Sequence, residues 1–169
     1  RPRGIAFTPD GKRAYVACEL ANTVYAISVP EHRVLTSIAA GEFANGVTMR
    51  PDGRRVFVSN GRAGTVSVID TSDNRVIDTV AVGQRPWNMA ITPDGSKLYV
   101  ANGRSGTVSV IDAVGNRKLL TVPRHRNHVD AGVSRECRTD IRTRPRDHVQ
   151  DAGRKDLLRQ SAEHQRADR

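Results

Sequence analysis

Short apolar runs, separated by clusters of Pro, Gly, Asn and Asp, recur along the first 122 residues. One unit contains NMAIT at 88–92, KLYVA at 97–101 and TVSVID at 107–112, and the corresponding fourth run is clearest one unit earlier, as VIDTVAV at 76–82. These runs are rich in β-branched residues, which favour strands. Valine and isoleucine occupy both faces of the third run, which is typical of a sheet packed between two neighbours. The pattern predicts four-stranded antiparallel sheets with no helix longer than one turn.

The units are copies of one another. Residues 92–112 read TPDGSKLYVANGRSGTVSVID, and a shift of 42 residues gives RPDGRRVFVSNGRAGTVSVID at 50–70. Of the 35 positions aligned between 46–80 and 88–122, 18 are identical. A fixed period near forty that is filled with short strands is the signature of a β-propeller in which each repeat is one blade. The sequence therefore predicts an all-β fold, a β-propeller fragment with three four-stranded antiparallel blades at 1–43, 44–85 and 86–122.

Turn chemistry follows the same period. Each copy carries a Pro-Asp-Gly turn, in which proline pre-sets φ, aspartate bonds nearby backbone and glycine accepts a positive φ. We therefore interpret Asp94 and Gly95 as turn residues, and Asp70 as a turn initiator after the third strand. Asn60 and Asn102 are likewise expected to form turns. In the first copy, Glu19 stands where the others have glycine, which reads as ordinary drift in a loop.

The repeated motifs resemble a known family. PDG, YVAN at 99–102, TVSVID, the VAVG closure and RPW at 85–87 are similar to the YVTN-type β-propeller repeats. These in turn resemble the propellers of quinoprotein amine dehydrogenases, lactonases and surface-layer proteins. The resemblance implies the fold, and it implies a periplasmic or extracellular location. Because such families include binding domains, electron-transfer enzymes and hydrolases, it does not by itself imply one chemistry.

Four side chains are candidates for a binding site. In a four-stranded blade, the loop between the second and third strands and the loop that enters the next blade lie on the same rim. That rim should carry Arg62, Arg85, Trp87 and Arg104. Arginine pairs with carboxylate or phosphate, and tryptophan often anchors interfaces, so this rim is predicted to bind an anionic ligand or an acidic protein. The alternative is that the arginines are solvated loop residues copied with the blade and that Trp87 packs against the next blade.

No catalytic constellation stands out. His32 is the single histidine within the repeats, and CxxC, HExxH, GxSxG, P-loop and Rossmann glycine patterns do not occur. We therefore expect no catalytic residue, no metal and no cofactor, and a non-enzymatic binding scaffold. The alternative is the propeller portion of a quinoprotein dehydrogenase-like or lactonase-like enzyme whose catalytic residues lie outside these blades.

The composition changes at residue 123, where the repeat stops. Residues 123–169 hold twelve basic and eight acidic residues and no aromatic residue, with no sustained apolar period. Three interpretations are open: a basic arm, a short helical extension, or an out-of-frame reading. We predict a disordered or out-of-frame tail at 123–169.

The net charge and the number of blades indicate which kinds of partner this chain can have. The tail supplies part of the net charge of +9, and acids alternate with bases along the repeats, so nucleic-acid binding is disfavoured. No run of eighteen apolar residues predicts a membrane span. A closed propeller has about four to eight blades. The sequence therefore suggests that further blades are supplied in cis or by oligomerisation.

Overall fold

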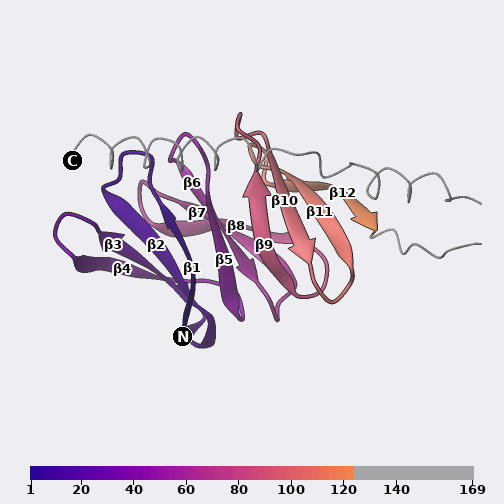
Figure 1. The fold of residues 1–169 in the computed structure, drawn as a ribbon, viewed down its shortest axis with the longest axis horizontal. Helices are drawn as coiled ribbons and strands as arrows, with labels where there is room; N and C mark the ends of the chain where they lie inside the picture. Colours follow the sequence, from indigo (N-terminus) through magenta and orange to yellow (C-terminus); the bar gives the residue numbers. More distant parts are fainter. Residues whose placement is uncertain (124–169) are drawn as a thin grey trace, which may run out of the picture. The chain divides into compact units, whose positions relative to one another are not determined.

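The computed structural model describes residues 1–123, which form twelve strands and one turn of 3-10 helix. The strands build three four-stranded antiparallel sheets in chain order, as predicted (Figure 1). The first sheet contains β1 (Pro2–Phe7), β2 (Arg13–Cys18), β3 (Thr23–Ser28) and β4 (Arg33–Ala39), with the helical turn η1 (Glu19–Ala21) between β2 and β3. The second contains β5 (Ala44–Met49), β6 (Arg55–Asn60), β7 (Thr65–Asp70) and β8 (Arg75–Ala81). The third contains β9 (Pro86–Ile91), β10 (Lys97–Asn102), β11 (Thr107–Asp112) and β12 (Arg117–Pro123).

The strands keep the 42-residue period closely. The middle strands β2, β6 and β10 begin at positions 13, 55 and 97. The last strand, β12, includes Pro123, one residue past the predicted end of the third blade. The predicted tail otherwise lies outside the described residues.

The hydrophobic cores lie between the sheets. Val56, Val58 and Ile69 of the second sheet pack in a cluster with residues of the first sheet. Phe57 and Val66 point to the other face and pack with residues of the third sheet. This arrangement explains why apolar residues occupy both faces of the strands, because successive side chains of a strand alternate between its faces.

The innermost strands of neighbouring sheets approach closely, and two glycines permit this. A Cβ atom on Gly46 of β5 would lie 2.1 Å from the carbonyl oxygen of Trp87 in β9. A Cβ atom on Gly4 of β1 would lie 2.4 Å from the carbonyl oxygen of Asn45 in β5. The two glycines occupy the same position of the repeat, so each removes a side chain where the next inner strand packs.

A partly buried hydrogen bond joins the first two sheets. Tyr15 is fully buried, and its hydroxyl donates to Oδ1 of Asn74 at 2.7 Å. Burial raises the pKa of the Tyr15 hydroxyl, so it remains a donor. The equivalent residues between the second and third sheets are Phe57 and Asn116. Phenylalanine has no hydroxyl, and Oδ1 of Asn116 is buried with no hydrogen-bond partner in the described part of the chain.

The Pro-Asp-Gly turns form as predicted. Gly95 donates its N–H to the carbonyl of Thr92 at 2.8 Å and has a φ of +69°, in the left-handed region. The Asp94 carboxylate accepts the backbone N–H of Ser96 at 3.1 Å. A hydrogen bond from the Thr92 hydroxyl and those from Ser96 lower the pKa of Asp94 to about 2. Asp70 likewise accepts the N–H of Ser72 at 2.9 Å, which confirms it as a turn initiator.

Replacing Gly95 with valine should lower the free energy of unfolding by at least about 1 kcal/mol, because a β-branched residue is strained at this positive φ. Urea denaturation would measure the loss. Gly103→Val is the control, since Gly103 is exposed, has no positive φ, and a Cβ there would come no closer than 3.5 Å to another atom. Equal stability of the two variants would contradict the role of the turn.

Candidate functional site

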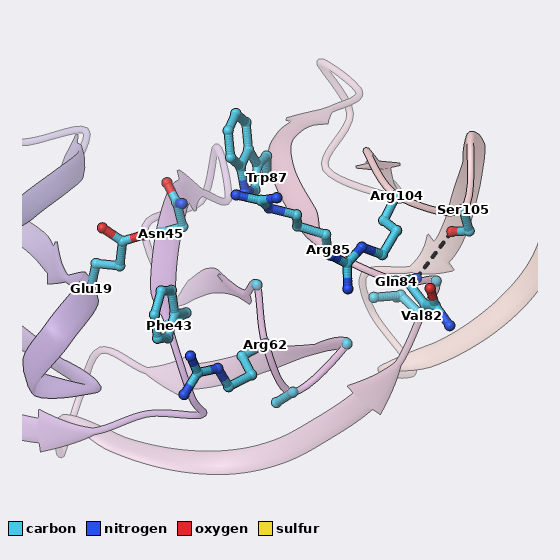
Figure 2. Close-up of a pocket in the computed structure, with 14 residues that line it drawn as sticks. Glu19, Phe43, Asn45, Arg62, Val82, Gln84, Arg85, Trp87, Arg104 and Ser105 are labelled. Atoms are coloured by element: carbon cyan, nitrogen blue, oxygen red, sulfur yellow. Dashed lines mark hydrogen bonds between the residues drawn. The ribbon is translucent and has the colours of Figure 1, made fainter.

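A cleft of about 910 Å³ opens at the end of the sheets that carries the loops between β2 and β3, between β6 and β7 and between β10 and β11 (Figure 2). The loops that enter the second and third sheets line the same cleft. All four residues selected from the sequence face it, namely Arg62, Arg85, Trp87 and Arg104. Their role in binding stays a prediction.

Backbone hydrogen bonds hold the two kinds of loop together. Gly61 donates its N–H to the carbonyl of Phe43 at 2.8 Å, and Gly103 donates to the carbonyl of Arg85 at 2.9 Å. Phe43 and Arg85 occupy the same position of the repeat and have positive φ values of 60° and 56°. Positive φ is uncommon for residues other than glycine. The repeated conformation therefore presents residue 43 and residue 85 to the cleft in the same way.

Two of the arginines lie over aromatic rings. The Arg62 guanidinium carbon is 4.4 Å from the centroid of the Phe43 ring, and that of Arg85 is 5.1 Å from the centroid of the Trp87 ring (Figure 2). Both distances are within the range of a cation–π interaction. Trp87 is 47% exposed, so its ring is not buried against another sheet among the described residues. Phe43 was missed by the sequence analysis, although the repeat places it at the position of Arg85.

The cleft carries excess positive charge. Within residues 1–123, none of Arg62, Arg85 and Arg104 forms an ion pair with a carboxylate; the ion pairs there involve other arginines. Guanidinium groups remain protonated at any physiological pH. The three side chains are therefore available to an anion that enters the cleft.

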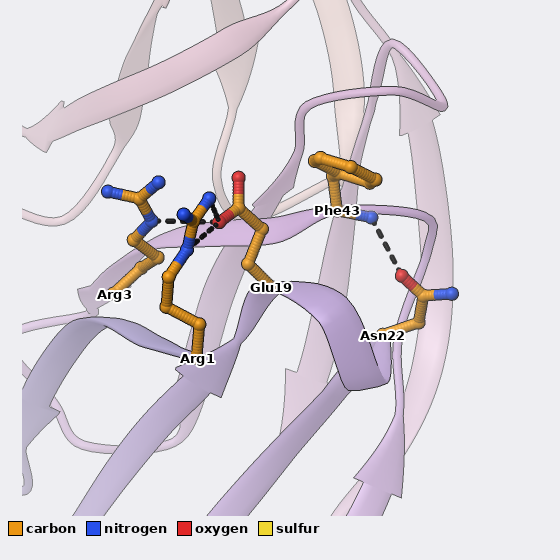
Figure 3. A network of polar contacts seen from close by, with 5 residues as sticks. All are labelled: Arg1, Arg3, Glu19, Asn22 and Phe43. Carbon is orange, nitrogen blue, oxygen red and sulfur yellow. Dashed lines mark hydrogen bonds and ion pairs between the residues drawn. The ribbon is translucent and has the colours of Figure 1, made fainter.

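One carboxylate lies at the edge of this cleft. The Glu19 side chain is 6% exposed, and its Oε2 accepts hydrogen bonds from Nε of Arg1 at 2.8 Å and from Nε of Arg3 at 2.9 Å (Figure 3). These bonds, first that from Arg3, lower the pKa of the Glu19 carboxyl. The interpretation as ordinary loop drift did not anticipate these contacts, in which Glu19 neutralises part of the charge of Arg1 and Arg3. The signal in the sequence is the acid that replaces glycine beside a strand end.

Two buried asparagines, Asn60 and Asn102, connect adjacent strands at the start of loops that line the cleft. Nδ2 of Asn60 donates to Oγ1 of Thr65 at 3.0 Å and to Oγ of Ser67 at 2.9 Å, and Oδ1 of Asn60 accepts the N–H of Gly41 at 3.1 Å. Asn102 makes the equivalent bonds to two hydroxyls. Their side chains therefore tie β6 to β7 and β10 to β11, and this differs from the turn-forming role expected.

The described residues contain neither a cluster of metal-ligating side chains nor a membrane-spanning helix. Within 1–123, no group of three His, Cys, Asp or Glu side chains is arranged to hold a metal ion. In the same part of the chain, no helix is long and apolar enough to cross a membrane.

Comparisons with known proteins agree with this architecture. A family model described as "Lactonase, 7-bladed beta-propeller" matches residues 1–134. No curated protein sequence matches this chain at a significant level. Among solved structures, the chain is similar to hydrazine synthase of Kuenenia stuttgartiensis, with a TM-score of 0.69 and 26% identity over 71% of this chain and 35% of that one.

Two further solved structures share the fold alone. A functionally unknown protein from Desulfotomaculum acetoxidans matches with a TM-score of 0.64 and 22% identity, covering 73% of this chain and 42% of that one. U3-55K matches with a TM-score of 0.67 and 16% identity, covering 74% of this chain and 40% of that one. The chain thus spans well under half the length of each of these three proteins.

Proposed function

Because this chain belongs to the lactonase family of seven-bladed β-propellers, we propose that its blades act as a binding module whose loop-end cleft receives an anionic ligand or an acidic segment of a partner protein. One observation carries the proposal: three arginines without carboxylate partners in the described residues line a single cleft.

The geometry favours anions over other ligands. The planar guanidinium group donates two parallel hydrogen bonds to a carboxylate or phosphate. Packing over Phe43 and Trp87 limits the orientations of Arg62 and Arg85, which reduces the entropy lost when they bind. The exposed Trp87 ring also offers apolar contact area beside the charges.

Charge reversal tests the proposal. The double variant Arg62→Glu, Arg104→Glu should bind citrate, or a fluorescently labelled oligoglutamate peptide, at least about tenfold more weakly than the wild type, a loss of about 1.4 kcal/mol. Fluorescence anisotropy would measure binding of the peptide, and calorimetry binding of citrate. The loss should shrink as salt is raised from about 0.01 M to 1 M, because the Debye length falls from about 30 Å to 3 Å.

The matched control is the double variant Lys12→Glu, Arg54→Glu. These two residues are exposed and follow the Pro-Asp-Gly turns, at the end of the sheets away from the cleft. The change in net charge is the same, so a general electrostatic effect would weaken binding equally in both double variants. Equal losses, or unchanged affinity after reversal at Arg62 and Arg104, would contradict an anion site in the cleft.

A second candidate function is lactone hydrolysis, which the family match favours, and Glu19 at the edge of the cleft is the carboxylate to test for it. The lowered pKa of Glu19 makes it a weak base, which argues against general-base catalysis by this group. A pH-stat assay on simple γ- and δ-lactones would decide. Hydrolysis by the wild type that disappears in Glu19→Gln would support an enzyme. If the wild type hydrolyses none of these lactones, the binding module is the function that the cleft supports.

A further inference from the structure

The first sheet brings two further arginines to the end of the sheets that carries the cleft. Glu19 donates its backbone N–H to the carbonyl of Arg1 at 2.9 Å, and Gly61 donates to Phe43 in the same way at 2.8 Å in the second sheet. Arg1 therefore occupies the loop position of Phe43 in the 42-residue register, and Arg3 follows near the start of β1. Two guanidinium groups of the first sheet thus belong to the same rim as the arginines of the other sheets.

Both guanidinium groups converge on one carboxylate oxygen (Figure 3). Nε and Nη2 of Arg1 donate to Oε2 of Glu19, and Nε of Arg3 donates to the same oxygen at 2.9 Å. Oε1 of Glu19 accepts no hydrogen bond within residues 1–123. Guanidinium groups bind the carboxylate and phosphate oxygens of ligands in this manner. The two arginines therefore form an anion site whose occupant is a side chain of the same chain.

This occupied site borders the cleft. Glu19 lines the cleft, and its side chain is 6% exposed, whereas the side chains of Arg1 and Arg3 are 55% and 41% exposed. A guanidinium group has more N–H donors than Glu19 engages, so both arginines keep donors for another anion. The same hydrogen bonds, first that from Arg3, lower the pKa of the Glu19 carboxyl, so the pair favours negative charge at this point.

We infer that Arg1 and Arg3 form a second anion subsite of the cleft, and that Glu19 occupies this subsite and keeps the anionic groups of a ligand away from it. The inference rests on the proposed function, because it concerns the same cleft. A ligand then places its carboxylate or phosphate at the arginines of the second and third sheets and a neutral group at Glu19. The ligand class is therefore a molecule with an anionic end and a neutral, hydrogen-bond-donating end, and Glu19 is a specificity-determining residue.

The selectivity follows from the charge of Glu19. An anionic group at this edge of the cleft would meet the Glu19 carboxylate, and like charges that are brought together at a binding site disfavour the complex. A neutral amide or hydroxyl group meets no such repulsion and can donate a hydrogen bond to Oε1. The carboxylate also cancels part of the charge of Arg1 and Arg3, so the attraction for anions remains strongest at the arginines that have no carboxylate partner within residues 1–123.

Two labelled peptides of equal length test the inference, one of glutamate only and one in which glutamate alternates with glutamine. Glu19→Gln should bind the all-glutamate peptide at least about tenfold more tightly than the wild type, because it removes the repulsion and opens the second subsite. The gain for the alternating peptide should stay below about threefold, since fewer of its groups can use that subsite. Fluorescence anisotropy at low ionic strength would measure both affinities.

Two control variants separate the subsite from other effects. Glu31→Gln removes the same charge from an exposed ion pair with Arg33, which lies at the end of the sheets away from the cleft, and it should leave both affinities unchanged. Glu19→Asp keeps the charge and should gain much less affinity than Glu19→Gln. Circular dichroism would establish that each variant is folded.

Arg3 provides the decisive comparison. Added to Glu19→Gln, Arg3→Gln should remove most of the gain for the all-glutamate peptide, whereas Arg33→Gln should not. A gain that survives Arg3→Gln, or that Glu31→Gln reproduces, would overturn the second subsite. If the wild type does not bind the peptides, the proposed function fails by itself. In that case, binding that appears in Glu19→Gln and requires Arg3 would still uphold the subsite, and no binding by this variant would overturn it.

Discussion

Replacing Gly46 with alanine should lower the free energy of unfolding by about 3 kcal/mol, the upper part of the range for overpacking a well-packed site. The added Cβ atom would lie 2.1 Å from the carbonyl oxygen of Trp87 and 3.0 Å from Oγ of Ser59. The first of these is a backbone atom, so β5 and β9 must separate to make room. The same Oγ atom bridges the two strands, because it donates to the Trp87 carbonyl at 2.7 Å and accepts the N–H of Gly46 at 2.9 Å. Separation of the strands would therefore also weaken this bridge.

Urea denaturation of the described blades would measure the loss, with Gly61→Ala as the matched control. A Cβ atom on Gly61 would come no closer than 3.5 Å to another atom, and Gly61 has no positive φ. The control should change stability by less than about 1 kcal/mol, and in the stabilising direction, because an unstrained alanine reduces the conformational entropy of the unfolded chain. If Gly46→Ala were as stable as Gly61→Ala, the close approach of β5 and β9 would be wrong.

Removing the Tyr15 hydroxyl should cost about 1–3 kcal/mol, because Tyr15→Phe leaves the oxygen of Asn74 without its donor in a buried interface. The converse change, Phe57→Tyr, should add about 1 kcal/mol to stability, because it places a hydroxyl at the equivalent position opposite Oδ1 of Asn116, which has no hydrogen-bond partner among the described residues. Tyr15→Phe removes a hydroxyl from the interface of the first and second sheets, and Phe57→Tyr adds one at the same position of the interface of the second and third sheets. The two substitutions should therefore change the free energy of unfolding in opposite directions. Denaturation midpoints with unchanged slopes would show both effects as changes in stability.

A double-mutant cycle separates the hydrogen bond from the packing of the ring. In an Asn74→Ala background, Tyr15→Phe should cost little, since the acceptor is already absent. The same cycle with Asn116→Ala and Phe57→Tyr should abolish the gain in stability. If Phe57→Tyr destabilised the protein in both backgrounds, the hydroxyl would lack room at that site and the equivalence of the two interfaces would fail.

The sequence alone was sufficient for the three sheets, the Pro-Asp-Gly turns and the rim that carries Arg62, Arg85, Trp87 and Arg104. Each of these depends on chemistry that is local along the chain. Gly95 adopts a positive φ in its own turn, and the valines and isoleucine on both faces of TVSVID mark a strand that is buried on both sides. Repetition at 42 residues then places equivalent loops on one end without any knowledge of contacts.

The tertiary structure decided which side chains meet across the loops and the sheets. Glu19 looked like drift because its partners, Arg1 before β1 and Arg3 within β1, are distant from it in the sequence. Phe43 became a site residue through its place in the cleft lining and its contact with Arg62. Within residues 1–123, the Asn116 oxygen likewise lacks a partner, because Phe57 of another sheet stands where Tyr15 supplies a hydroxyl in the preceding interface. The physical reason is that strand propensity and turn geometry depend on nearest neighbours, whereas ion pairs, ring contacts and buried hydrogen bonds depend on distances that only the packed chain establishes. Composition and period therefore determined the blade, and packing determined the chemistry of its cleft and faces.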